Sequence, residues 1–220
     1  MQIQAMTRLE RSIRESRDTD KTLVNWWLFV LLLSWITFGI MSLVVYFQRL
    51  SRRDRHFERI QSTLRDAVAC TREVAAERAE DVEPQLRDIE SNLAHAEQSF
   101  LKARGAALWF ILTLLTLGIA GVYPLYYLTR DFYQLQRFEQ DLLDDLSKAW
   151  TKLGITKYPV SVDVTVPERN FWLYLVLTVL TLGIWGLYWD YTIHTDPERV
   201  FKESSRWEET MLASFRQMSL

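Results

Sequence analysis

Three long apolar segments constrain this chain more than any other feature. They run from Leu23 to Phe47, from Ala106 to Leu128 and from Phe171 to Trp189, and none contains a charged side chain. Each has about 20 to 25 residues, so a straight helix would measure roughly 30 to 37 Å and could cross a hydrocarbon core of about 30 Å. Buried helices of a water-soluble bundle rarely lack polar residues on every face. This segregation therefore predicts a membrane protein.

The three segments are copies of one unit. Each contains the sequence Thr-x-Gly-Ile, which begins at Thr37, Thr116 and Thr181, and a tryptophan precedes each copy. A small residue follows the threonine by five positions every time, and each copy continues into a charged stretch with helical periodicity. The residues expected to form the core or hinge of the repeat are Thr37, Gly39, Thr116, Gly118, Gly121, Thr181, Gly183 and Gly186.

The third copy has the sequence LTLGIWGLYW from Leu180 to Trp189. It resembles the signature of a bacterial family of small inner-membrane proteins of unknown function, roughly Thr-Leu/Cys-Gly-Ile-Tyr-Gly-x-Tyr-Trp and often present in tandem. The second copy is similar to this signature. The first copy keeps the threonine and the first glycine, but Ser42 and Val44 replace the second glycine and the tyrosine. The resemblance implies a protein of the bacterial inner membrane and implies no particular activity.

Two arrangements of the repeats remain open. If each copy crossed the bilayer once, successive charged tails would lie on opposite sides, although all three copies have the same order of motifs. The positive-inside rule does not separate the sides either, because Lys and Arg flank the segments in nearly equal numbers. One solution is a re-entrant hairpin that reverses at Thr-x-Gly, since glycine tolerates the required dihedral angles. The other is a set of kinked spanning helices with small residues at helix contacts.

Aromatic residues mark the ends of the apolar segments. Indole and phenol rings favour the membrane interface because they are apolar bodies with one polar tip. Asp190, the acidic residue that directly follows the third segment, is interpreted as interfacial rather than as a proton or ion site. The aromatic residues expected at the interface are Trp26, Trp27, Trp109, Tyr126, Trp172 and Trp189.

Residues 49–105 predict a helical hairpin outside the bilayer. Apolar side chains recur at three- and four-residue spacing on two arms, and an acidic stretch ending at Pro84 separates the arms. This pattern favours an antiparallel coiled coil that projects from the membrane. The expected seam residues are Phe57, Ile60, Leu64, Val74, Leu86, Ile89, Leu93 and Phe100.

The other segments predict helices and one strand. Between Val160 and Val166, valines alternate with small or polar residues, which is the pattern of a short extended strand. A lone strand needs a backbone partner, so it either pairs with another subunit or forms a strap on its own helices. We expect an all-α membrane protein apart from this strand. Its segments are an N-terminal amphipathic helix (1–22), the first membrane repeat (23–48), the coiled-coil hairpin (49–105), the second repeat (106–128), a surface helix (129–154), the extended strand or strap (155–170), the third repeat (171–193) and a C-terminal amphipathic helix (194–220).

The sequence lacks the residue patterns of common catalytic sites. His56, His95 and His194 are dispersed, Cys70 is the sole cysteine, and there is no phosphate-binding loop or nucleophile motif. The net charge of −2 gives no sign of a nucleic-acid partner. We therefore expect no enzymatic activity, no cofactor and no metal.

The partners expected instead are membrane lipids and further copies of the chain. The expected function is a structural protein that self-assembles and organises or curves the bacterial inner membrane, with its soluble parts mostly in the cytoplasm. One alternative is an oligomeric channel or transport accessory with the three repeat threonines near a polar path. Another is an anchor that recruits an unidentified soluble protein.

Overall fold

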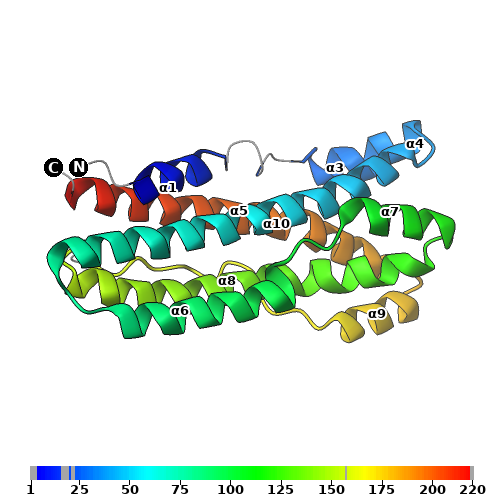
Figure 1. The fold of residues 1–220 in the computed structure, drawn as a ribbon. Helices are drawn as coiled ribbons and strands as arrows, with labels where there is room; N and C mark the ends of the chain where they lie inside the picture. The colour runs from blue at the N-terminus through cyan, green and yellow to red at the C-terminus, as the bar shows by residue number, and fades with distance from the viewer. Residues whose placement is uncertain (1–3, 16–19, 21–22, 157, 219–220) are drawn as a thin grey trace.

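The chain folds into an elongated helical bundle. The computed structural model describes residues 4–15, 20, 23–156 and 158–218, and Figure 1 shows its long helices lying side by side. None of the described residues forms a β-strand, so the expectation of an all-α fold is confirmed and that of a short strand is wrong.

Three long helices build the bundle: α5 (Ile40–Arg78), α8 (Val122–Lys152) and α10 (Ile184–Met218). They contain 39, 31 and 35 residues, so each is about 45 to 60 Å long. Each helix continues without a break from the apolar part of a repeat into the charged part of the chain. The surface helix and the C-terminal helix expected from the sequence are therefore the distal parts of α8 and α10.

A shorter arm precedes each long helix, and the chain reverses between the two. All three reversals lie at one end of the bundle, opposite the end of α10 (Figure 1). We call this the hairpin end. The short elements are α3 (Trp26–Leu28), the π-helical η1 (Phe29–Leu33) and α4 (Ser34–Ile36) before α5; α7 (Ala106–Leu115) and the 3-10 helix η3 (Ile119–Gly121) before α8; and α9 (Phe171–Leu180) before α10.

None of the helices in the described part of the chain combines enough length with enough apolarity to cross a membrane. Of the two arrangements that the sequence leaves open, the structure has the hairpins, and the kinked spanning helices are wrong. The physical reason is the pair of left-handed residues in each Thr-x-Gly turn, which reverses the chain instead of bending it.

The helical hairpin expected at 49–105 is present, but it does not project. Its first arm belongs to α5, and its second consists of α6 (Glu83–Ala96) and the π-helical η2 (Glu97–Leu101). Helix α6 also packs on α8, while α5 also packs on α1 (Gln4–Arg14) and α10. The expected seam residues lie in this shared core, buried except for the half-buried Phe100. An apolar helix face can serve several neighbours as well as one, so its spacing does not specify a free coiled coil.

The segment expected to be a strand is instead a strap across the bundle. Val160, Val162 and Val166 are buried, as the alternation predicts, but side chains rather than a second strand satisfy the backbone. The Thr165 N–H donates to Gln136 Oε1 at 2.9 Å, and the N–H groups of Val160 and Asp163 donate to Ser147 Oγ at 3.0 Å and Glu203 Oε1 at 2.8 Å. This segment therefore gives no support for pairing between subunits.

Candidate functional site

The hairpin end carries nearly all the exposed large apolar side chains of the described residues. Phe38, Leu117 and Leu182 occupy the tips of the three turns and are 98%, 96% and 95% exposed. Among the described residues, Tyr158 is the one exposed large apolar side chain outside the repeats. The exposed surface is therefore strongly apolar at the hairpin end, and the rest of the surface carries few large apolar side chains.

Each turn has the same backbone conformation. The residue between threonine and glycine is left-handed, with φ of 48°, 51° and 49° in chain order, and the glycine that follows has φ of 85°, 95° and 95°. The glycine N–H donates to the carbonyl five residues earlier, at 2.9, 2.8 and 2.8 Å in Gly39, Gly118 and Gly183. This bond closes the last turn of the first arm while the left-handed pair redirects the chain.

The repeat threonine bonds to both arms of its hairpin. Thr181 Oγ1 donates to the carbonyl of Leu177 at 2.7 Å and accepts from the N–H of Trp185 at 2.9 Å. Thr37 and Thr116 make the same pair of bonds, with distances between 2.7 and 3.0 Å. One hydroxyl thus satisfies a carbonyl at the end of one helix and an amide at the start of the next.

The small residue five positions after the threonine lets the two arms approach closely. A Cβ atom on Gly121 would lie 3.0 Å from Thr113 Cγ2, and one on Gly186 would lie 3.0 Å from Thr178 Cγ2. In the first hairpin Ser42 occupies this place, and its hydroxyl lies 3.2 Å from that of Ser34. The contacting residue always lies three positions before the repeat threonine, a feature that our sequence reasoning missed.

An ion pair closes the base of the second and third hairpins. Arg104 lies 3.3 Å from Asp131, and Arg169 lies 2.8 Å from Asp196. Each arginine precedes the repeat threonine by 12 residues and each aspartate follows it by 15, so the two pairs are equivalent in the repeat. The sequence contained this signal, but the two partners are 27 residues apart and the charges alone did not reveal it.

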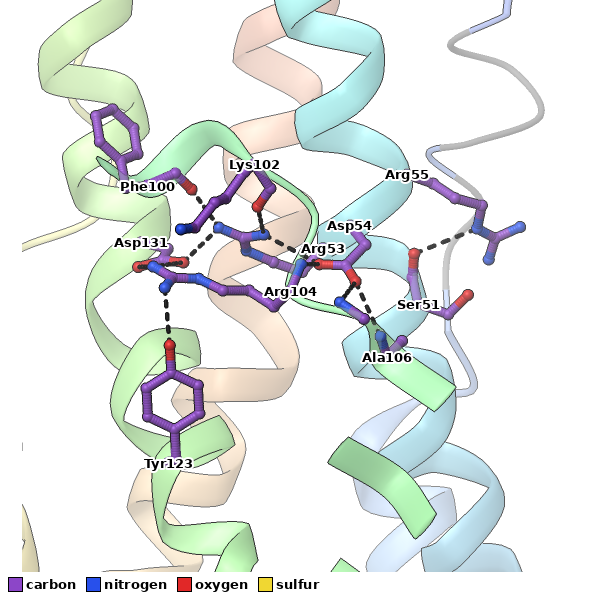
Figure 2. Close-up of polar contacts among 11 residues, drawn as sticks. Ser51, Arg53, Asp54, Arg55, Phe100, Lys102, Arg104, Ala106, Tyr123 and Asp131 are labelled. Atoms are coloured by element: carbon purple, nitrogen blue, oxygen red, sulfur yellow. Dashed lines mark hydrogen bonds and ion pairs between the residues drawn. The ribbon is translucent and has the colours of Figure 1, made fainter. Parts of the chain in front are cut away.

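A buried arginine connects the second hairpin to α5 (Figure 2). Arg53 is fully buried and pairs with Asp54 at 3.0 Å and with Asp131 at 2.5 Å. It also donates to the carbonyl groups of Phe100 and Lys102.

Asp54 in turn accepts from the backbone N–H groups of Arg104, Gly105 and Ala106 at 2.9 to 3.0 Å. A carboxylate at this position stabilises the N-terminus of α7. The Arg53 cluster therefore fixes the direction in which the second hairpin leaves the bundle.

The first hairpin is anchored to the third through Asp190. This carboxylate pairs with Arg49 and accepts from Trp26 Nε1 at 2.8 Å. Burial acts to raise the pKa of Asp190, but the bonds from Arg49 and Trp26 outweigh it and hold the pKa below its ordinary value. His194, one turn further along α10, contacts the carbonyl of Val24 at 2.8 Å. The residue interpreted as interfacial is thus a link between two repeats.

The structure places the predicted aromatic residues unevenly. Trp27 and Trp172 are exposed, whereas Trp109 and Tyr126 are half-buried. Two others are buried and bonded, because Trp26 contacts Asp190 and Trp189 Nε1 donates to Thr129 Oγ1 at 2.9 Å. By contrast, all eight predicted hinge residues lie at the turns or at the close contact of the arms. In the described chain, no three His, Cys, Asp or Glu residues are grouped so that they could hold a metal ion.

Comparisons with known proteins give one match. Comparison with curated proteins finds no similar sequence, and comparison with solved structures finds no similar fold. Residues 169–215, which comprise the third hairpin with its basal ion pair and most of α10, match the family described as domain of unknown function (DUF4234).

Proposed function

We propose that this chain is a membrane protein whose three hairpins enter one leaflet from the same side. The observation that carries the proposal is the near-complete exposure of Phe38, Leu117 and Leu182 at one end of the bundle. Exposing this much contiguous apolar surface to water is costly, and such a patch is typical of a membrane or protein interaction site.

The length of the arms fits insertion to the midplane. Helices α7 and α9 have 10 residues each, so they are about 15 Å long, or half of a hydrocarbon core of about 30 Å. Their bases carry the ion pairs Arg104–Asp131 and Arg169–Asp196, which suit the polar headgroup region. The geometry supports a polar body that stays on one side of the bilayer.

A chain reversal inside lipid requires its backbone polar groups to be satisfied. In the second turn, the N–H groups of Thr116, Leu117, Gly118 and Ile119 all donate to carbonyl groups within the hairpin, at 2.8 to 3.2 Å. The Thr116 hydroxyl donates a second bond to the carbonyl of Leu112 and accepts from one further amide, the N–H of Ala120. The amide groups of the reversal are therefore satisfied within the hairpin, which lowers the cost of placing the turn in lipid.

Wedges confined to one leaflet expand that leaflet alone. We therefore propose that the protein is a structural element that self-assembles and organises or curves the bacterial inner membrane, with its bundle in the cytoplasm. The channel alternative has less support, because the hydroxyl groups of Thr37, Thr116 and Thr181 are occupied by the hairpins' own backbone and not directed to a shared polar path.

Replacing the three tip residues by asparagine tests insertion. Asparagine tolerates the left-handed conformation better than most residues, so the variant Phe38→Asn, Leu117→Asn, Leu182→Asn should keep its turns. Burial of each original side chain contributes about 1.5 to 3 kcal/mol, so we expect binding to phospholipid vesicles to fall by at least about a hundredfold. Flotation with the vesicles measures this binding.

Tyr158→Asn is the matched control, because Tyr158 is 80% exposed but lies outside the repeats. It should float like the unchanged protein. Equal flotation of the triple variant and the control would overturn the insertion proposal. Electron microscopy of the same vesicles tests the structural role: we expect remodelled vesicles carrying protein assemblies, and undeformed vesicles carrying dispersed monomers would contradict that role.

A further inference from the structure

Four unpaired charges line one pocket beside the bases of the second and third hairpins. The cavity has a volume of about 330 Å³ and lies between α8 and the residues that precede α9. Arg130, Arg137 and Asp141 reach it from α8, and Glu168 reaches it from the other side. None of the four forms an ion pair with another described residue, whereas Arg169 at the same pocket is paired with Asp196. Arg130 donates one hydrogen bond to the Tyr126 hydroxyl and Arg137 donates one to Gln140 Oε1 at 3.0 Å, which leaves their other N–H donors for a ligand.

With the hairpins inserted as proposed, the pocket lies at the boundary between the apolar arms and the polar body, at the level of the lipid headgroups. Arg130 follows the apolar part of α8 by two residues, and Glu168 precedes the apolar arm α9 by three. The rings of Tyr126 and Phe171, whose centroids are 5.4 Å apart, contact each other and join the two hairpins beside the pocket. Phe100 and Phe138, which are 5.8 Å apart, provide an apolar wall.

The charges have an order along α8. Arg130 is nearest to the apolar stretch, Arg137 is two turns further, and Asp141 is one turn beyond that. A phospholipid presents its phosphate first and its terminal group further from the hydrocarbon. An arginine suits the phosphate because its guanidinium donates several hydrogen bonds in a fixed plane. A carboxylate suits a primary ammonium, which has three N–H donors.

We propose that this pocket binds the headgroup of a zwitterionic aminophospholipid, with Arg130 and Arg137 on the phosphate and Asp141 and Glu168 on the ammonium group. Two cations and two anions balance each other, so a purely anionic headgroup gains little there. A quaternary ammonium lacks N–H donors, so phosphatidylcholine cannot donate a hydrogen bond to the carboxylates. The inference rests on the proposed insertion of the hairpins.

Tryptophan quenching by brominated lipids tests this site. The protein is reconstituted in phosphatidylcholine vesicles that contain brominated phosphatidylethanolamine, phosphatidylglycerol or phosphatidylcholine. Trp172, exposed and four residues from Glu168, is a reporter close to the pocket. We expect phosphatidylethanolamine to bind about tenfold more tightly than the other two lipids, as expected for one added charge-assisted hydrogen bond.

Two double variants distinguish the two halves of the site. Asp141→Asn with Glu168→Gln should lose the preference for phosphatidylethanolamine and gain one for phosphatidylglycerol, because the pocket becomes basic. Arg130→Gln with Arg137→Gln should favour neither lipid over phosphatidylcholine. Asp145→Asn with Lys148→Gln removes an exposed ion pair further along α8 and should behave like the unchanged protein.

Equal quenching by all three lipids in the unchanged protein would overturn the proposed site, and so would a preference for phosphatidylglycerol. Millimolar free phosphoethanolamine should reduce the phosphatidylethanolamine preference, because it offers the same phosphate and ammonium groups to the pocket. Absence of quenching by every lipid would contradict the insertion itself, so failure of the site and failure of the proposed function give different results.

Discussion

Glu139 is a carboxylic acid buried in the middle of the bundle. It is fully buried, accepts from the Ser204 hydroxyl at 3.1 Å, and interacts with a second buried carboxylate, Glu208. Burial and the neighbouring charge of Glu208 raise the pKa of Glu139 to about 8. Burial also raises the pKa of Glu208 to about 7, although Arg59 opposes this shift. Both acids therefore hold protons in the folded state that they release when the chain unfolds.

This shift predicts that stability falls as the pH rises from 6.5 to 8. In this window the folded state binds more protons than the unfolded state, so the free energy of unfolding decreases by up to about 1.4 kcal/mol per pH unit for each group. His56, whose pKa burial lowers to about 4, acts in the opposite direction but only below pH 6.5. Glu139→Gln should remove the contribution of Glu139 and stabilise the protein by about 2 kcal/mol or more at pH 9.

Chemical denaturation in mild detergent at pH 6 and pH 9 measures this effect. Asp144→Asn changes an exposed carboxyl of α8, the helix that carries Glu139, and should leave the pH dependence unchanged. If Glu139→Gln kept the pH dependence of the unchanged protein, the buried acid would not be the cause.

The second arm of each hairpin is the first part of a long bundle helix. Helices α5, α8 and α10 begin at a turn of the hairpin end and extend into the polar body. The ion pairs Arg104–Asp131 and Arg169–Asp196 join a short arm to its long helix at the boundary between the two regions. They therefore set the angle at which the arms leave the bundle.

The pair Arg169–Asp196 should behave as a coupled unit. Both side chains are largely buried, and removal of one partner leaves the other with an uncompensated charge. We expect Arg169→Gln and Asp196→Asn each to lower the free energy of unfolding by about 2 to 4 kcal/mol, and the double variant to lower it by less than the sum. A double-mutant cycle by chemical denaturation measures a coupling of about 1 to 3 kcal/mol. Strictly additive effects would show that the pair has no structural role.

The sequence predicted much of the hairpin end because its signals are local. Residues with restricted conformations, such as Gly39, Gly118 and Gly183, identify turns by themselves, and repetition showed that the three turns are equivalent. The helical character of 49–105 followed from periodicity in the same way.

The contacts between elements could not be read in this way. Val160 and Val162 alternate as in a strand, but their environment is decided by the side chains of α8 and α10, which are distant in sequence. Likewise, the partners of Arg53 lie on a loop and on α8. Periodicity shows which face of a segment is buried and does not show which element covers it.

The whole molecule has two unlike ends. The three apolar turns lie at one end, and the end of α10 and the turn between α5 and α6 lie at the other (Figure 1). Three direct repeats that each reverse once return the chain from the hairpin end to the polar body, which accounts for charged stretches of the same kind after every copy. The proposed insertion into one leaflet follows from this arrangement.

Cysteine labelling across sealed membranes tests this topology most directly. Cys70 is buried, and burial raises its pKa to about 12, so the native thiol gives little background. Single cysteines at the exposed positions Ala79, Lys152 and Ala213 lie far from the hairpin end, and a cysteine at Leu117 lies at a tip.

Intact spheroplasts and inverted membrane vesicles are each treated with a membrane-impermeant thiol reagent. We predict that the cysteines at Ala79, Lys152 and Ala213 react in the same preparation and fail to react in the other, while the cysteine at Leu117 reacts in neither. Reaction of the cysteines at Ala79 and Lys152 from opposite sides would contradict hairpins that enter and leave on one face.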